Sequence, residues 1–99
     1  MINLKNKKVL ITGASGGIGK SIVKKFVSLE ATVLGTGTKE EKLDNLKKEN
    51  PSIKTKKFDI SQHSKTEKFI EEVTLELGGL DILINNAGIN LDTLSLRMF

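Results

Sequence analysis

Short apolar runs recur along the chain, separated by longer stretches in which apolar and charged residues are mixed. A short apolar run that ends at glycine or another turn residue is typical of a buried strand in a parallel sheet. The pattern predicts such strands at Lys8–Thr12, Ala31–Leu34, Ile53–Ile60 and Leu80–Ile84. Lysines interrupt the third run, so we expect that strand nearer an edge of the sheet.

Apolar residues between the first two strands recur at the spacing of one helical face. They are Ile18, Ile22, Val23, Phe26 and Val27. The stretch between the third and fourth strands has the same spacing, and glycines end it after Leu77. We expect that helix to begin at about Gln62 or Lys65, with a face of Phe69, Ile70, Val73 and Leu77.

The helix between the second and third strands is marked at both of its ends. Thr38 followed by Glu41 fits a capping box, so Thr38 is the predicted N-cap. Leu43 and Leu46 give the helix a thin apolar stripe. Pro51 ends it, because proline disfavours helical backbone in the residue before it.

Strands that alternate with helices of this length predict right-handed crossovers and a parallel sheet with helices on both faces. The predicted fold class is α/β: the βαβαβαβ portion of a Rossmann-type sheet, with strand order 3-2-1-4. Residues 92–99 resemble the start of a fourth helix without a stop signal. We therefore expect residues 1–99 to be the N-terminal part of one larger domain, cut inside that helix, with the fourth strand left as an unpaired edge.

Glycines are concentrated between the first strand and the first helix, where Gly13, Gly16, Gly17 and Gly19 fall within seven residues. A loop at this position lets the backbone approach a pyrophosphate, and the following helix N-terminus offers N–H groups and a partial positive charge. Gly13 would allow the tight turn, Gly17 the close approach and Gly19 the packing of helix on strand. A plain turn needs fewer glycines, so the pattern favours a nucleotide-binding loop.

Two better-known phosphate loops fit this spacing less well. A Walker A loop reads G-x-x-x-x-G-K-[ST], whereas five residues separate Gly13 from Gly19. No predicted strand ends in a magnesium-binding aspartate, because Asp81 begins its strand. The strict G-x-G-x-x-G fingerprint does not match either, since the order here is G-x-x-x-G-x-G. A P-loop nucleoside triphosphatase is kept as an alternative that predicts magnesium-dependent ATP binding.

This glycine spacing resembles that of the short-chain dehydrogenase/reductase family. The family's further motifs follow in the same order: Asp59 after the third strand and Asn85-Asn86-Ala87-Gly88 after the fourth. The resemblance covers essentially the whole chain. It implies an oxidoreductase that transfers a hydride from a nicotinamide cofactor to a carbonyl, with residues 1–99 holding the cofactor-binding part.

The resemblance also assigns residues of this chain to the cofactor. Those implied at the phosphate loop are Gly13, Ser15, Gly16, Gly17, Ile18 and Gly19. Asp59 would hydrogen-bond the adenine amino group, with Ile60 beside it. The adenosine ribose would lie along Asn86, Ala87 and Gly88, and either Asn85 or Asn86 could also tie the fourth strand to its neighbour.

The run from Gly88 to Met98 is similar to the stretch that follows N-N-A-G in bacterial 3-oxoacyl-[acyl-carrier-protein] reductases. This narrower resemblance implies NADPH-dependent reduction of a 3-oxoacyl thioester on acyl carrier protein, in fatty acid synthesis. It also implies a homotetramer for the full-length protein. Another short-chain carbonyl reductase and a catalytically inactive nucleotide-binding module stay open as alternatives.

The end of the second strand bears on which nucleotide would bind. An acidic residue there usually takes the ribose hydroxyl of NAD, and residues 35–38 contain none. Thr36, Thr38 and Lys39 offer donors and positive charge for the extra phosphate of NADP, so NADP(H) is favoured over NAD(H). Related reductases often carry arginine where this chain has Gly16, which weakens the preference unless Lys39 compensates.

Composition limits the remaining chemistry. The chain has no tyrosine, so the family's Y-x-x-x-K signature cannot occur, no catalytic residue is assigned, and the chain alone is expected to be inactive. It has no cysteine and no His/Asp/Glu cluster at metal-ligand spacing. The net charge of +4 comes from dispersed lysines and a single arginine, so we expect no nucleic acid partner. No apolar stretch approaches the roughly 20 residues of a membrane span, and no signal-peptide core is seen; a cytoplasmic location without a membrane partner is expected.

Overall fold

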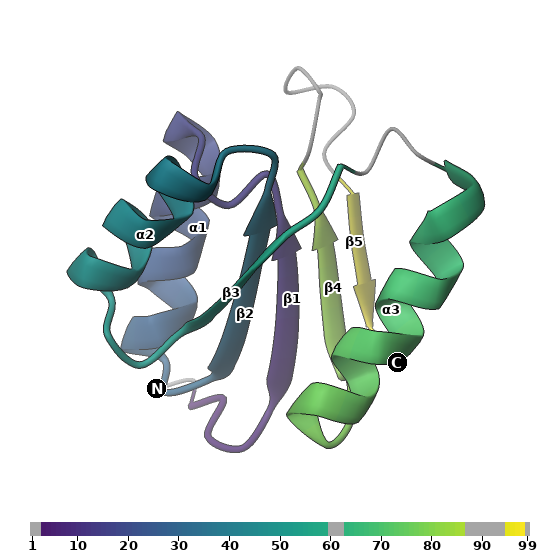
Figure 1. Cartoon of the computed structure of the whole chain (residues 1–99). Helices are drawn as coiled ribbons and strands as arrows, with labels where there is room; N and C mark the ends of the chain where they lie inside the picture. The colour runs from purple at the N-terminus through teal and green to yellow at the C-terminus, as the bar shows by residue number, and fades with distance from the viewer. Residues whose placement is uncertain (1–2, 60–62, 87–94, 99) are drawn as a thin grey trace.

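The computed structural model of the chain describes residues 3–59, 63–86 and 95–98 (Figure 1). These residues form one sheet with the strand order β3-β2-β1-β4-β5. The elements are β1 (Lys8–Thr12), α1 (Gly17–Ser28), β2 (Thr32–Gly37), α2 (Glu40–Glu49), β3 (Lys54–Lys57), α3 (His63–Leu77), β4 (Ile82–Asn85) and β5 (Ser95–Met98). The first four strands are parallel and have the predicted order 3-2-1-4, which confirms the α/β fold.

Helices cover both faces of the sheet, with α1 and α2 on one face and α3 on the other (Figure 1). Successive residues of a strand point to opposite faces. Val33 therefore packs in the cluster that contains Leu46 of α2, while the next residue, Leu34, packs in the cluster that contains Phe69 of α3. Burial on both faces explains why consecutive residues are apolar inside both strands, Val9 to Ile11 in β1 and Val33 and Leu34 in β2.

The C-terminal segment differs from the prediction. Ser95–Met98 is a strand antiparallel to β4, with Ser95 opposite Asn85 and Met98 opposite Ile82, and is not the start of a helix. Its sequence alternates polar and apolar residues, a pattern that also suits a strand. The edge of β4 offers a row of N–H and C=O groups that a strand satisfies and a helix does not. Consequently β4 is not the unpaired edge that the sequence pattern predicts.

The start of α2 also differs from the prediction. The N-cap is Lys39, in extended conformation and without a side-chain capping hydrogen bond, so the capping box at Thr38 is wrong. Glu40 and Glu41 lie in the first turn, where their negative charge complements the helix dipole and stabilises the start in another way. The predicted stop is confirmed, since Asn50 is the C-cap.

Strand β3 is shorter than the predicted Ile53–Ile60. Ile53 lies before it, 1% exposed in the core, and Phe58 lies after it with its ring stacked on that of Phe69 at 4.0 Å between centroids. β3 lies at the edge of the sheet, as its lysines predict. Lysine on an edge strand hinders pairing with another chain.

Candidate nucleotide-binding site

The loop between β1 and α1 turns sharply at the carboxyl end of β1. Gly13 has φ of 61°, in the left-handed region that favours glycine, so its predicted role in the tight turn is confirmed. The carbonyl oxygen of Gly13 accepts a hydrogen bond from the N–H of Gly16 at 3.3 Å. Gly16 is the N-cap of α1, so the helix starts directly behind this turn.

Gly19 lets α1 lie against the same loop. A Cβ at position 19 would overlap the carbonyl oxygen of Gly13 and would lie 2.8 Å from Cα of Ala14. Both atoms belong to the backbone and have little room to move. The prediction that Gly19 permits the helix to pack on the first strand's end is therefore confirmed.

Gly17 has a different environment, although it lies in the same turn of α1. A Cβ at position 17 would meet no atom within 4 Å among the described residues. Gly17 and Ile18 are exposed, and the first turn of α1 has no acidic residue. The N–H groups of this turn have no acceptor within the helix, so the helix offers an open, positively polarised end to a ligand.

Two glycines of β2, Gly35 and Gly37, lie against the loop between β1 and α1. This contact was not predicted from the sequence. A Cβ at Gly35 would lie 2.8 Å from Cβ of Ala14, and one at Gly37 would lie 3.1 Å from Oγ of Ser15. The N–H of Ala14 also donates to the carbonyl oxygen of Thr36 at 2.9 Å. The available signal was the alternation Gly35-x-Gly37, because glycine inside a strand often marks a close approach of other backbone.

Both asparagines at the end of β4 tie that strand to β1 and to the loop. The hydroxyl of Thr12 donates to Oδ1 of Asn85 at 3.0 Å and accepts from the backbone N–H of Asn86 at 2.9 Å. The side-chain amide of Asn86 donates to the carbonyl oxygen of Gly13 at 3.2 Å. The predicted tie is confirmed, and it involves both residues.

Of the three residues expected to face the extra phosphate of NADP, Thr36 is buried, whereas Thr38 and Lys39 are exposed. Thr36 is 1% exposed, and its hydroxyl has no hydrogen-bond partner within the described part of the chain. It lies two residues after Leu34 and so on the face covered by α3. Thr36 is therefore not placed to bind a phosphate from solvent. Thr38 and Lys39 are exposed where α2 begins.

Asp59 lies close to the end of β2, as the position of its neighbour shows. The N–H of Phe58 donates to the carbonyl oxygen of Gly37 at 2.9 Å, and Asp59 follows as an exposed residue. The carboxyl ends of the parallel strands β1, β2, β3 and β4 thus lie at the same end of the sheet (Figure 1). Ile60, Ala87 and Gly88, which sequence reasoning also assigned to the site, lie outside the described residues.

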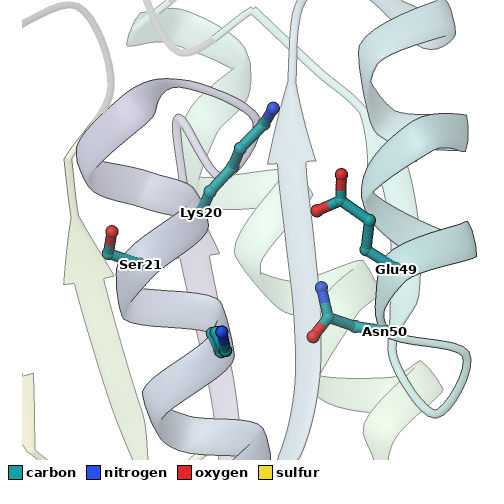
Figure 2. A pocket seen from close by; sticks show the side chains of 5 residues that line it. Lys20, Ser21, Glu49 and Asn50 are labelled. Carbon is teal, nitrogen blue, oxygen red and sulfur yellow. The ribbon is translucent and has the colours of Figure 1, made fainter.

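A groove of about 350 Å³ lies between α1 and the end of α2 (Figure 2). Its lining includes Lys20, Ser21, Lys24, Glu49 and Asn50. None of the described residues assigned to the nucleotide lines this groove, so it is separate from the glycine loop. Within residues 3–59, 63–86 and 95–98, no group of three or more potential ligands could hold a metal, and no helix is long and apolar enough to cross a membrane.

Comparison with known proteins agrees with this geometry. The short chain dehydrogenase family matches residues 7–98. The chain is 39% identical to the 3-oxoacyl-[acyl-carrier-protein] reductase FabG of Vibrio cholerae, over 98% of this chain and 40% of that protein. It is 38% identical to the uncharacterized oxidoreductase DltE of Bacillus subtilis, over 89% of this chain and 35% of that protein.

A solved structure shows the same fold. The crystal structure of a short chain dehydrogenase from Bacillus anthracis matches with a TM-score of 0.76 at 39% identity, over 85% of this chain and 35% of that one. The chain belongs to the short-chain dehydrogenase/reductase family of oxidoreductases. It spans about 40% of the length of the curated relatives it matches, and the matched part contains the glycine loop and the four parallel strands.

Proposed function

We propose that this chain binds NADPH at the edge of the sheet where the glycine loop lies. The observation that carries the proposal is the open first turn of α1. A Cβ at Gly17 would meet no atom within 4 Å among the described residues outside its own turn of helix, and no acidic side chain lies in that turn to repel a phosphate. A pyrophosphate placed there would receive hydrogen bonds from backbone N–H groups at the positive end of the helix.

The remaining parts of the nucleotide have candidate partners along the same edge. Thr38 and Lys39 would hold the extra phosphate of NADPH, since one supplies a hydroxyl and the other a positive charge. Asp59 and Ile60 would lie at the adenine, and Asn86, Ala87 and Gly88 at the adenosine ribose. The reduced nicotinamide, when bound, supplies a hydride to a carbonyl carbon.

We propose further that the nucleotide serves reduction of a 3-oxoacyl thioester carried on acyl carrier protein, in a cytoplasmic homotetramer. Support comes from the name of the Vibrio cholerae relative and from the similarity of the run between Gly88 and Met98 to that enzyme class. A carbonyl reductase with another substrate is the second candidate, favoured by the similarity to an oxidoreductase of a different name.

Replacing Lys39 by glutamate tests the NADPH preference. The exchange removes a positive charge and adds a negative one near the 2′-phosphate, and a lost charge-assisted hydrogen bond alone is worth about 1.5–3 kcal/mol. We expect the Kd of NADPH, measured by calorimetric titration, to rise at least about tenfold, which corresponds to about 1.4 kcal/mol. The Kd of NADH should stay unchanged.

The matched control is Lys68→Glu, which makes the same charge change at an exposed position of α3, on the opposite face of the sheet. It should leave the Kd of both nucleotides unchanged. An equal effect of the two variants on NADPH would overturn the role of Lys39. No binding of NADPH by the unmodified chain would overturn the nucleotide proposal.

The reductase proposal has a separate test in the gene. A reading frame that continues past Phe99 into a serine and a Y-x-x-x-K signature would support it, because the tyrosine gives the proton to the developing alkoxide. A stop codon directly after Phe99 would contradict it and favour a nucleotide-binding module.

A further inference from the structure

We infer that Gly35 and Gly37 of β2 form a seat that sets the position of the phosphate-binding loop relative to α2. This inference rests on the proposed nucleotide-binding function, because it concerns the two parts of the chain that would hold the pyrophosphate and the 2′-phosphate. Gly35 and Gly37 would be positioning residues and would not touch the nucleotide themselves.

The first part of the argument is the contact with the loop. The space of the missing side chain at Gly35 is occupied by Cβ of Ala14, 2.8 Å from where a Cβ would lie. At Gly37 the neighbour is Oγ of Ser15, at 3.1 Å. The hydrogen bond from the Ala14 N–H to the carbonyl of Thr36, between the two glycines, fixes the loop in this register.

The second part is the contact with α2 on the same strip of β2. A Cβ at Gly35 would lie 3.6 Å from Cδ2 of Leu46, and one at Gly37 would lie 3.5 Å from Cδ2 of Leu43. The same α2 begins directly after Lys39. One narrow strip of strand therefore touches both the loop that would hold the pyrophosphate and the helix whose start would hold the 2′-phosphate.

Backbone conformation does not explain these two glycines. Neither Gly35 nor Gly37 has a positive φ, so both backbone geometries suit any residue. A strand interior favours β-branched and aromatic side chains, and glycine there weakens the strand. The close approach of the Ala14 Cβ leaves no room for a side chain at position 35 without a shift, and the approach of the Ser15 hydroxyl makes position 37 tight.

The geometry provides a compensating pair of substitutions. Within the described residues, Cβ of Ala14 and Cδ2 of Leu46 are the atoms that a Cβ at position 35 would meet within 4 Å. Gly35→Ala alone must therefore displace the loop. In the double variant Ala14→Gly/Gly35→Ala the short contact disappears and only an ordinary contact with Leu46 remains, so the loop can return.

Three measurements on the whole chain test whether Gly35 and Gly37 position the loop. They are the Kd of NADPH by calorimetry, the urea midpoint, and the amide ¹H–¹⁵N chemical shifts of the loop glycines without nucleotide. Those glycines are Gly13, Gly16, Gly17 and Gly19. We expect Gly35→Ala to raise the Kd about tenfold or more and to move the loop amides, because backbone shifts relieve overpacking. The double variant should restore both. Val33→Ala is the control, since Val33 is buried on the same face of β2 but lies outside the seat.

Val33→Ala should lower the urea midpoint while the Kd and the loop amides stay unchanged. The inference would be overturned if the loop amide shifts of Gly35→Ala equalled those of the unmodified chain. It would also be overturned if the double variant did not fold or did not recover the original loop amide shifts. If Gly35→Ala alone does not fold, refolding of the double variant supports the seat. Absence of NADPH binding in the unmodified chain refutes the proposed function only, because the nucleotide-free amide shifts still decide the inference.

Discussion

Gly17 and Gly19 lie two residues apart in the first turn of α1, and their surroundings predict opposite effects of the same substitution. Gly17→Ala adds a methyl group that meets nothing within 4 Å among the described residues. Gly19→Ala places the methyl group on the carbonyl oxygen of Gly13 and within 3 Å of two backbone atoms of Ala14. The pair therefore separates helix propensity from packing.

The magnitudes follow from these two terms. Alanine is favoured over glycine by up to about 1 kcal/mol in a helix, so Gly17→Ala should raise the free energy of unfolding by about 0.4–1 kcal/mol. Gly19→Ala has the same gain but also a packing cost of about 1–3 kcal/mol or more. Because the obstructing atoms are backbone, we expect the upper part of that range and a net loss of about 2 kcal/mol.

Urea unfolding followed by far-ultraviolet circular dichroism measures the difference, since the chain has neither tryptophan nor tyrosine. With a slope of about 1–3 kcal/mol per molar urea, the two midpoints should differ by about 1 M or more. Gly17→Ala should nevertheless weaken NADPH binding, because its methyl group occupies the space proposed for the pyrophosphate. Coincident midpoints, or a larger loss for Gly17→Ala than for Gly19→Ala, would refute this account of the loop.

Three further outcomes are expected in the same unfolding assay. Thr36→Val should raise stability by about 1 kcal/mol, because it replaces a buried hydroxyl that has no partner in the described part of the chain with a methyl group of similar size; a loss would show that the hydroxyl is satisfied. Leu46→Ala should cost about 2–5 kcal/mol, since Leu46 is fully buried between α2 and the sheet. Leu75→Ala should change stability by less than about 0.5 kcal/mol, because Leu75 is 83% exposed; equal losses at the two leucines would contradict the assigned packing.

The parallel sheet and the glycine turn could be predicted because both depend on local pattern. Residues 9–11 are apolar on both faces, and that continuous run predicts a central strand whatever its neighbours are. Gly13 has the positive φ of the turn itself, and a side chain at Gly19 is excluded by Gly13 and Ala14, six and five residues earlier in the same loop. Sequence spacing alone can therefore assign their roles.

Residues 95–98 could not be predicted in the same way. Ser95-Leu96-Arg97-Met98 is compatible with a helical or an extended pattern, and the free hydrogen-bonding edge of β4 favours the extended one. The predicted N-cap of α2 was also wrong. Thr38 and Glu41 have the spacing of a capping box, but the helix begins after Lys39.

By itself, the sequence determined the order of strands and helices from β1 to β4, the two apolar faces of the sheet and the place of the glycine loop, because hydrophobic period and glycine position act over a few neighbouring residues. The tertiary structure decided which residues meet at the candidate site. Thr36 is buried because α3 covers its face of β2, and Gly35 and Gly37 contact the loop because β1 pairs in parallel with β2. Those contacts join residues distant in the chain, and only the packed sheet brings them together.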